Sequence, residues 1–288
     1  MLLRKYVHED LDFIAQINSF AAVQLQYNKS ILPENIVCAE RDGSVIGIGF
    51  LLIHQTLETQ KLQITLSTYT DNEHQDNIEA DNLLMDGLIN RFHQIKKEKP
   101  DVTVRLRICC ETDEIDDMQF FIHKGFSINS AIPVLKYDLT KKITHYKIPE
   151  GITIQKLTFN EATMKAYLDA DSLSSREWEY ECEADIWFNT GDPSFSCYAA
   201  ICDGKIIGAI SIWNISEERA ATENIFVIPE FRRKNIAREL VSTAFEELKN
   251  RNLKIATLSL NGENLPAMKL YLSCDYSLYY NLIEMLCE

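Results

Sequence analysis

A repeated hairpin is the feature that most limits how this chain can fold. Residues 37–53 read VCAERDGSVIGIGFLLI, and residues 198–214, 161 positions further on, read YAAICDGKIIGAISIWN. In each segment an apolar strand is followed by an Asp-Gly pair and then by a second strand that contains Ile-Gly. Asp-Gly between apolar runs is a strong signal for a two-residue hairpin turn, because both residues tolerate positive φ. The two pairs are Asp42-Gly43 and Asp203-Gly204.

A second pair of similar segments follows the hairpins in the same order. Met118–Phe126 reads MQFFIHKGF and Met268–Tyr276 reads MKLYLSCDY, and each comes after an apolar strand and begins as a helix. Repeats of this kind indicate a duplication, and two domains of about 140 residues fall within the usual range of domain sizes. We therefore expect domains over residues 1–145 and 146–288, joined at the polar segment 139–151 with its Pro-x-Gly break.

The second half alternates strands and helices in a way that predicts a mixed α/β fold. Runs of β-branched and aromatic residues predict strands, and apolar residues at a helical period predict helices. The expected strands are 152–156, 196–202, 205–214, 222–228, 254–260 and 276–285, and the expected helices are 160–169, 174–188, 235–251 and 264–273. We expect each domain to be a central mixed β-sheet flanked by helices.

A basic turn joins a strand to a helix within residues 222–237, TENIFVIPEFRRKNIA. Pro229 ends the strand because it cannot donate to a ladder. The N–H groups of such a turn and of the following helix converge, and they can hold a pyrophosphate. Asn235 falls where the backbone needs positive φ, which asparagine tolerates, and Ala237 is small enough for close approach of a ligand. A plain surface turn before an amphipathic helix fits this segment equally well. The turn carries three consecutive basic residues, Arg232, Arg233 and Lys234.

The turn resembles the acetyl-CoA signature of the GCN5-related N-acetyltransferases (GNAT), which is Arg/Gln-x-x-Gly-x-Gly/Ala at a strand–helix junction. Residues 232–237, RRKNIA, match it with asparagine at the first glycine position, and Val227-x-Pro229 matches the family spelling ahead of it. The resemblance implies that the pyrophosphate of acetyl-CoA lies on the backbone of residues 233–237. It also implies that the pantetheine arm pairs with the main chain of residues 225–227.

A second segment adds to the resemblance. Residues 261–276, NGENLPAMKLYLSCDY, look like the family's Asn-x-x-Ala-x-x-Leu-Tyr-x-x-x-Gly-Phe segment, with Asp275 in place of the glycine and Tyr276 in place of the phenylalanine. Together the two segments imply a tandem GNAT protein that uses acetyl-CoA as cosubstrate and needs no metal. The implied cofactor-binding residues are Ile225, Phe226, Val227, Arg232, Arg233, Lys234, Asn235, Ile236, Ala237, Asn264 and Ala267.

Transfer of an acetyl group to an amine requires the amine to lose a proton, an oxyanion to be stabilised and a thiolate to leave. All six histidines precede residue 146, so we do not expect a histidine base in the second half. By resemblance, Glu223 takes the amine proton, the N–H of Val227 meets the oxyanion, and Tyr271 is the general acid toward the thiolate. From the residues alone, Tyr271 also fits a packed core position, and Glu223 fits an exposed strand end.

These roles imply direct transfer of acetyl to a small amine or a peptide amino group. Two alternatives stay open, a non-catalytic acyl-CoA-binding regulator and an acyltransferase like mycothiol synthase, another tandem member. Residues 174–188, SSREWEYECEADIWF, would suit a cationic acceptor through charge and cation–π contact. An ordinary amphipathic helix with a solvated acidic face is the reading we favour for that segment.

The first half lacks a matching cradle. The position that corresponds to the basic turn reads DNEHQD over Asp71–Asp76. Acidic side chains around a pyrophosphate site are repulsive. We therefore expect residues 1–145 to form a degenerate GNAT-like domain that keeps the sheet, binds no CoA and has a structural role. Binding of a different ligand by this domain stays open.

Composition excludes several other classes of protein. A net charge of −14 and a pI near 4.9 argue against nucleic-acid binding, which needs a basic surface. The eight cysteines form no CxxC pair, which predicts free thiols in a reducing compartment rather than a metal site. The N-terminus lacks the apolar run of a signal peptide, and the longest apolar run, Val45–Ile53, is too short to span a bilayer. We expect a cytoplasmic protein with no membrane partner.

Overall fold

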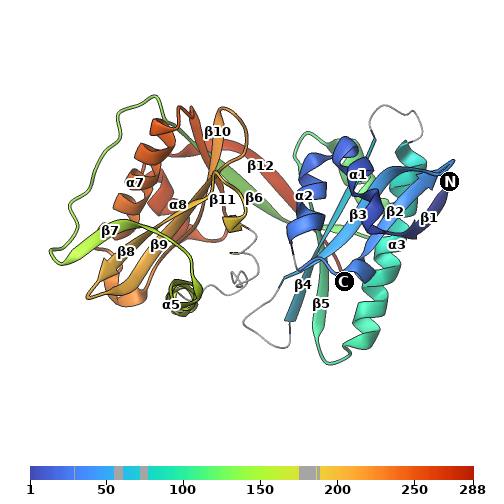
Figure 1. Cartoon of the computed structure of the whole chain (residues 1–288), viewed down its shortest axis with the longest axis horizontal. Helices are drawn as coiled ribbons and strands as arrows, with labels where there is room; N and C mark the ends of the chain where they lie inside the picture. Colours follow the sequence, from blue (N-terminus) through green and yellow to red (C-terminus); the bar gives the residue numbers. More distant parts are fainter. Residues whose placement is uncertain (29, 55–60, 72–76, 175–185, 187–188) are drawn as a thin grey trace. The chain divides into compact units, whose positions relative to one another are not determined.

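The computed structural model describes residues 1–288 except 29, 55–60, 72–76, 175–185 and 187–188, and the chain forms two compact units (Figure 1). Unit 1 comprises residues 1–129 and 284–288, and unit 2 comprises residues 130–283. These bounds differ from the expected division after residue 145, because residues 130–145 pack within unit 2 and residues 284–288 within unit 1. Each unit contains a mixed sheet with helices, so the predicted mixed α/β fold is confirmed.

Unit 1 is built on a sheet of order β1-β2-β3-β4-β5. The pairs β1–β2, β2–β3 and β3–β4 are antiparallel, whereas β4 and β5 are parallel and are connected by α3. The strands are β1 (Leu2–Lys5), β2 (Ile36–Arg41), β3 (Ser44–His54), β4 (Lys61–Thr70) and β5 (Thr103–Glu111). The helices are α1 (Leu11–Ile17), α2 (Ser19–Tyr27), α3 (Asn77–Glu98) and α4 (Ile115–His123), with 3₁₀ turns at His8–Asp10 and Pro33–Asn35.

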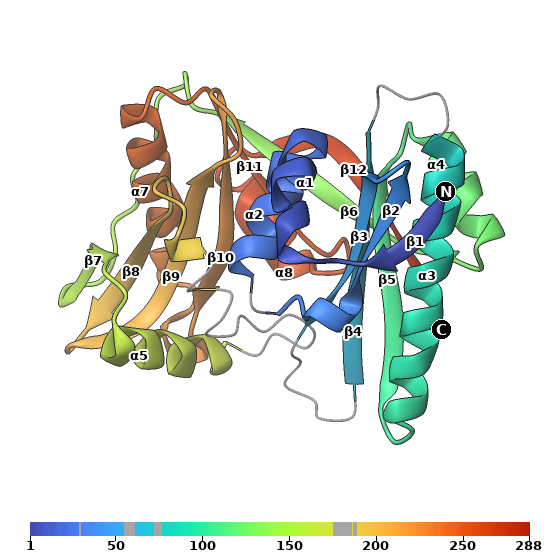
Figure 2. The same ribbon diagram turned by 45° about the vertical axis from the view of Figure 1, so that its right-hand side comes forward.

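Alternate residues of β3 face different helices. Ile48 and Phe50 are buried in the core formed with α1 and α2. Gly49 faces α3, where an added Cβ would lie 2.8 Å from Leu88 Cδ1. Figure 2 shows α3 on one side of this sheet and α1 and α2 on the other. The Ile-Gly alternation in the sequence therefore lets the long helix α3 pack closely against β3 while the opposite face carries large apolar side chains.

Unit 2 is built on a sheet of order β6-β11-β10-β9-β8-β7. Here β10 and β11 are parallel and are connected by α7, while β6–β11, β9–β10, β8–β9 and β7–β8 are antiparallel. The strands are β6 (Ser127–Asp138), β7 (Ile152–Leu157), β8 (Ser196–Cys202), β9 (Lys205–Asn214), β10 (Arg219–Val227), β11 (Ile255–Ser259) and β12 (Ser277–Cys287). The helices are α5 (Glu161–Ser172), α7 (Ile236–Asn250) and α8 (Leu265–Leu272), with a 3₁₀ turn at Pro229–Phe231.

The central strands of unit 2 alternate in the same way. Ala200 and Ile210 belong to the core that α7 covers, and Ala199 and Ala209 belong to the core that α5 covers through Tyr167. Helix α7 contributes a full apolar stripe to its core, which is why its sequence has a helical period. Both cores are made of small and β-branched strand residues beneath larger helix residues, which fits close packing of helices on a sheet.

One strand near the end of each half crosses from one unit into the other. Strand β6 begins in unit 1, but its residues Val134 to Asp138 pair with Ser259 to Ile255 of β11 in unit 2. Strand β12 begins in unit 2, and its last residues belong to unit 1. There Glu284 pairs with Arg107 of β5 at 3.5 Å, and Glu288 pairs with Arg105 at 3.6 Å. Unit 1 is therefore made from two segments of the chain, and unit 2 includes residues from before the expected join between the repeats.

The two predicted hairpin turns are confirmed. Asp42 and Gly43 have φ of 51° and 84°, and Asp203 and Gly204 have φ of 49° and 73°. The strands that flank the turns pair as expected. Most of the helix expected over 174–188 lies outside the described residues. The same is true of the acidic segment that follows Asp71 in the first half.

The segment that leads from β6 to β7 is fastened to the outer face of α7. His145 Nδ1 lies 2.8 Å from Glu239 Oε1, and its Nε2 lies 3.3 Å from Glu246 Oε1. The backbone N–H of Tyr146 donates to Glu239 at 2.6 Å, and the Ser242 hydroxyl donates to the Thr144 carbonyl at 2.6 Å. This segment thus follows the same helix that begins at the basic turn.

His145 gives this fastening a pH dependence. The hydrogen bond to Glu239 raises the pKa of His145 above its ordinary value of 6.5. Its stabilising effect is therefore fully present below pH 6.5 and is lost as the pH rises through the raised pKa. Because the ring is half exposed, we expect at most about 1 kcal/mol, or about 1–3 °C in Tm. Melting of wild type and His145→Ala at about pH 5.5 and about pH 8.5 should show this difference at the lower pH alone.

Candidate functional site

The basic turn has the backbone of an anion nest. Arg233 and Asn235 both adopt left-handed conformations, with φ of 59° and 61°, on either side of Lys234. Helix α7 starts directly after them, and the N–H of Glu239 makes the first helical bond, to Asn235 O at 3.0 Å. The N–H groups of residues 236–238 therefore have no acceptor within the helix, and the Asn235 side chain does not cap them. The expectation of positive φ at Asn235 is confirmed, and the turn fits a pyrophosphate.

The basic side chains of the turn divide into two kinds. Arg233 and Lys234 are exposed, and Lys234 Nζ lies 4.9 Å from the centre of the Phe231 ring. The guanidinium of Arg232 instead donates to the carbonyl of Val227 at 2.9 Å and to that of Ser174 at 2.7 Å. Arg232 therefore ties the end of β10 to the chain that leaves α5, and it is not simply a solvated charge beside the turn.

The left-handed backbone makes Asn235 a sensitive position. Left-handed φ costs about 1–2 kcal/mol for ordinary residues and is most unfavourable for β-branched ones, whereas glycine adopts it freely. We expect Asn235→Gly to leave stability and CoA affinity nearly unchanged. Asn235→Val should lower the free energy of unfolding by about 1–2 kcal/mol and weaken CoA binding by about tenfold. Urea unfolding and calorimetric titration with CoA measure the two effects, and wild-type values for the valine variant would show that the turn carries no such constraint.

Strand β10 is irregular immediately before the turn. Glu223 pairs with Ser211 and Phe226 with Ala209, so two residues of β10 stand opposite one residue of β9, and Asn224 takes a φ of 52°. Such a bulge bends a strand and re-aims its side chains. Gly208 permits it, because an added Cβ there would lie 2.6 Å from the Phe226 carbonyl oxygen. The bulge, at residues 224 and 225, overlaps the start of the segment 225–227 that was predicted to meet the pantetheine arm.

The parallel ladder between β10 and β11 ends early. It runs from Arg219↔Ile255 to Ala221↔Thr257, although both strands continue beyond these residues. We call this end of the ladder the fork. Past it the two strands are linked through side chains, with the Ser259 hydroxyl 3.4 Å from Glu223 Oε1. Glu223, the predicted base, thus lies just past the fork and is half-buried.

Helix α8 carries the second predicted segment. The side chain of Asn264 accepts from Ala267 N at 3.1 Å, so this pair, which was expected to bind the cofactor, forms the N-cap of α8. Tyr271 lies one helical turn further on and is 8% exposed. Its ring meets the ring of Tyr276 edge-on, with centroids 5.7 Å apart. The structure therefore places Tyr271 against the residue that follows the helix.

Tyr276 brings the two predicted catalytic residues into one neighbourhood. Burial raises the pKa of Tyr276 well above its ordinary value of 10, and the charges of Tyr271 and Glu223 act in the same direction. The ring of Tyr276 contacts Tyr271, and its hydroxyl lies 2.6 Å from Oγ1 of Thr222, the residue before Glu223. Cys274 is buried beside them in sequence, and burial raises its pKa to about 11, so it stays a neutral thiol and is a poor nucleophile. This arrangement suits transfer without a cysteine intermediate.

Sequence reasoning missed three polar residues at the fork, namely Thr222, Ser259 and Tyr276. One signal for them was available. The family segment has phenylalanine where this chain has Tyr276, and a buried tyrosine hydroxyl needs a hydrogen-bond partner. That partner could not be identified without the register of the strands.

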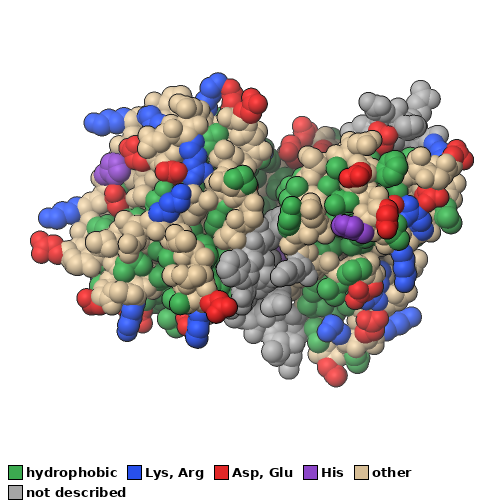
Figure 3. All heavy atoms as spheres, viewed as in Figure 1, with side chains coloured by type: hydrophobic (Ala, Val, Ile, Leu, Met, Phe, Trp, Pro, Cys, Tyr) green, Lys and Arg blue, Asp and Glu red, His purple; other side chains and the backbone are tan. Residues whose placement is uncertain are grey.

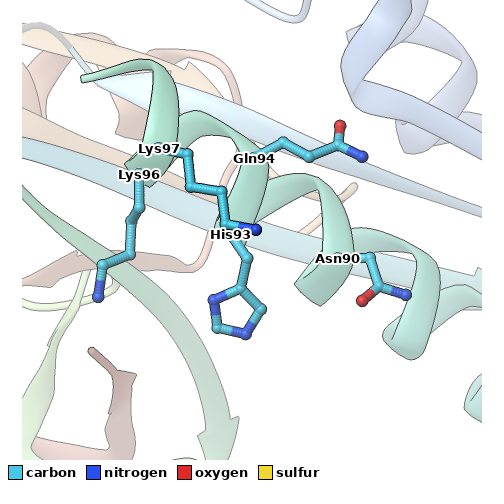
Figure 4. Close-up of a pocket in the computed structure, with 5 residues that line it drawn as sticks. All are labelled: Asn90, His93, Gln94, Lys96 and Lys97. Carbon is cyan, nitrogen blue, oxygen red and sulfur yellow. The ribbon is translucent and has the colours of Figure 1, made fainter. Parts of the chain in front are cut away.

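A surface hollow of about 640 Å³ lies elsewhere, along α3 of unit 1, and Figure 4 shows its lining side chains extending from that helix. None of the predicted site residues lines this hollow. The lining residues are Asn90, His93, Gln94, Lys96 and Lys97. Over the described part of the chain there is no group of three or more His, Cys, Asp or Glu side chains suited to a metal ion. Within the same residues no helix is long and apolar enough to cross a membrane.

Known proteins resemble part of this chain in sequence. Residues 160–276 match the acetyltransferase (GNAT) family. A streptothricin acetyltransferase from Escherichia coli is 30% identical over 87 residues, which are 30% of this chain and 50% of that protein. The chain thus spans about half the length of this curated relative. Over residues 160–276 the chain is therefore similar to the GNAT acetyltransferases.

Solved structures extend the likeness in fold to the whole chain. A tandem GNAT protein from the clavulanic acid biosynthesis pathway aligns with a TM-score of 0.71 at 10% identity, over 100% of this chain and 98% of that one. A GCN5-related N-acetyltransferase from Sphaerobacter thermophilus aligns with a TM-score of 0.63 at 16% identity, over 99% and 94% of the two chains. The predicted tandem GNAT fold is therefore confirmed.

Proposed function

We propose that this protein is an acetyl-CoA-dependent N-acetyltransferase whose working site lies in unit 2. One observation carries the proposal. The turn with two left-handed residues leads into the uncapped N-terminus of α7, directly after the bulged strand that holds Glu223. A backbone anion site and a half-buried carboxylate on one strand–turn–helix segment are what binding of acetyl-CoA and deprotonation of an amine require.

In this proposal the residues of unit 2 divide the reaction between them. The N–H groups of residues 233–237 bind the pyrophosphate, and the main chain of residues 225–227 aligns the pantetheine arm. Glu223 accepts the proton of the attacking amine, directly or through water. The new C–N bond then forms at the thioester carbon, the N–H of Val227 stabilises the oxyanion, and the C–S bond breaks as Tyr271 protonates the leaving sulfur.

The acceptor we propose is a small amine or a peptide amino group. The E. coli relative is named for streptothricin, which makes that compound one member of a test panel. On the faces drawn in Figure 3, acidic and basic side chains are interspersed over each unit. The described surface there therefore favours short-range selection of the acceptor over long-range electrostatic steering. We further propose that unit 1 has a structural role and binds no CoA, because its counterpart of the cradle is acidic.

Purified full-length protein tests these proposals in two steps. A rise in Tm on addition of CoA would support the cradle, since a ligand that binds the folded state stabilises it. Release of free CoA thiol from acetyl-CoA is then followed with a panel of polyamines, peptide N-termini and streptothricin. Glu223→Gln should lower turnover by about 10²-fold or more without loss of CoA binding. Its matched control is Glu230→Gln, an exposed glutamate on the turn after β10.

The outcomes separate the competing functions. A CoA-dependent Tm shift with no thiol release for any amine would favour a non-catalytic acyl-CoA-binding regulator. Turnover with a longer acyl-CoA in place of acetyl-CoA would favour an acyltransferase of the mycothiol-synthase kind. The absence of any Tm shift with CoA would contradict the cradle itself.

A further inference from the structure

A buried hydrogen-bond chain closes the fork between β10 and β11. The Thr222 hydroxyl donates to the Thr257 carbonyl at 3.2 Å, just where the parallel ladder ends. The Thr257 hydroxyl donates to the Ala220 carbonyl at 3.1 Å. Tyr276, which follows α8, brings its hydroxyl to 2.6 Å from Thr222 Oγ1. Two side-chain bonds between the strands and one from Tyr276 thus replace the ladder at its end.

The number of hydroxyl hydrogens decides which group donates in each of these hydrogen bonds. Thr222 has one hydroxyl hydrogen, and the Thr257 carbonyl accepts it. The 2.6 Å contact must then be a donation from Tyr276 to Thr222, which leaves Tyr276 with its own hydrogen committed. Thr222 is fully buried, and Tyr276 and Thr257 are each 3% exposed. Loss of the Thr222 hydroxyl would leave the buried Tyr276 hydroxyl without this acceptor, and loss of the Tyr276 hydroxyl would leave Thr222 with the Thr257 carbonyl and without its donor; both losses are costly.

Tyr276 also contacts the two helices next to the fork, α7 and α8, through its ring. Its ring packs edge-on against Tyr271, and Phe245 of α7 lies against it with centroids 5.4 Å apart. Its partner Thr222 directly precedes Glu223, whose carboxylate is met by Ser259 of β11. One side chain therefore contacts the predicted acid through its ring and reaches the strand of the predicted base through its hydroxyl.

We propose that Tyr276 is a positioning residue that fixes the opening of the fork and, through it, the separation of Glu223 and Tyr271. This inference rests on the proposed function of unit 2. It concerns a feature of this particular chain, because phenylalanine is usual at this place in the GNAT segment and phenylalanine cannot bond to Thr222. The hydrogen bond therefore needs both a hydroxyl at position 222 and a tyrosine at position 276.

Four variants test the proposal. Tyr276→Phe keeps the ring against Tyr271 and removes only the hydroxyl, and Thr222→Val removes its acceptor at nearly constant shape. Each should lower kcat about tenfold, since small displacements of catalytic groups are expensive, with KM for acetyl-CoA changed less than about threefold. The double variant should be no worse than Thr222→Val, because both lack the bond between Tyr276 and Thr222 and the bond from Thr222 to Thr257. Thr222→Ser retains the hydroxyl and should restore most of the activity.

A matched control and a second readout separate positioning from general damage. Tyr137 is in the same core, is 3% exposed and is stacked on Phe245, but its hydroxyl donates to Lys142 O, away from the fork. Tyr137→Phe should lower Tm as Tyr276→Phe does, yet leave kcat unchanged. Amide hydrogen exchange of residues 222–224 and 257–259 should quicken in Tyr276→Phe and not in Tyr137→Phe. Exchange needs no turnover, so it reports on the fork even if the wild-type protein acetylates no amine.

The exchange rates and the kcat values together test the positioning role of Tyr276. Faster exchange at the fork together with lower kcat in both single variants would support the proposal. Unchanged exchange, or faster exchange with unchanged kcat, would overturn it. If the wild-type protein showed no turnover, the proposed function would fail and the positioning role with it, whereas the exchange data would still decide whether Tyr276 holds the fork.

Discussion

Replacing Tyr271 by phenylalanine is expected to lower kcat by about 10²–10³-fold, the usual contribution of a general acid. Phenylalanine keeps the ring that packs edge-on against Tyr276 in the buried end of α8, so CoA affinity should change less than about twofold. Steady-state kinetics and calorimetric titration with CoA measure the two quantities.

Tyr146→Phe is the matched control for this experiment. The Tyr146 hydroxyl donates to the Ser273 carbonyl at 3.2 Å, so the variant loses a hydrogen bond at the end of the same helix without touching the predicted acid. It should keep wild-type kcat. If both variants lost activity equally, α8 would matter only as a scaffold, and if neither lost activity the acid would have to be found elsewhere.

Removing Arg4 is expected to destabilise unit 1 by about 3 kcal/mol, a figure typical of breaking a largely buried ion pair. Arg4 meets the carboxylate of Asp10 with two bonds of 2.7 and 2.8 Å, and it also contacts Glu40 of β2. The Val7 N–H donates to the same carboxylate at 2.9 Å. Asp10 is 5% exposed, so Arg4→Ala leaves a buried charge that has lost its cation. Urea unfolding monitored by a probe in unit 1 measures the loss.

The same cluster sets a pH dependence of known sign. Burial alone would raise the pKa of Asp10, but the bonds from Arg4 and from Val7 N–H hold it below its ordinary value of 3.8. The stabilisation is therefore present above pH 3.8 and is lost as the pH falls through the lowered pKa. Asp86→Ala is the control, because Asp86 pairs with Lys124 at the surface and is 60% exposed. It should change stability by less than about 1 kcal/mol, and an equal loss in both variants would contradict the special role of the Arg4 cluster.

Local signals in the sequence were sufficient for the hairpins and for the basic turn. A two-residue turn between strands requires positive φ at both residues, and Asp-Gly is one of the few pairs that tolerate it. Asp203 and Gly204 adopt this conformation. Asn235 was predictable for the same reason, since few residues other than glycine tolerate its φ. Arg233 was not predicted to share that conformation, because arginine has no preference for it and the surrounding turn imposes it.

Contacts between distant segments were beyond the reach of the sequence. The hydrogen bond from Tyr276 to Thr222 joins residues 54 positions apart, and it depends on where the ladder of β10 and β11 ends. Arg232 was expected to face a ligand, yet its guanidinium reaches Ser174, 58 positions away. Such partners are chosen by tertiary geometry, whereas spacing and composition describe only neighbours along the chain. The catalytic roles of Glu223 and Tyr271 remain predictions that the experiments above decide.

Strands β6 and β12 each have residues in both units, and this affects how the protein folds during synthesis. Residues 284–288, which ion-pair with β5, leave the ribosome after all of unit 2, so unit 1 waits for its final strand while its neighbour is being synthesised. Unit 2 in turn takes its strand β6 from the sequence of the first half. Cutting the gene at the join between the two repeats would yield two fragments, each with a missing strand and an open sheet edge prone to aggregation.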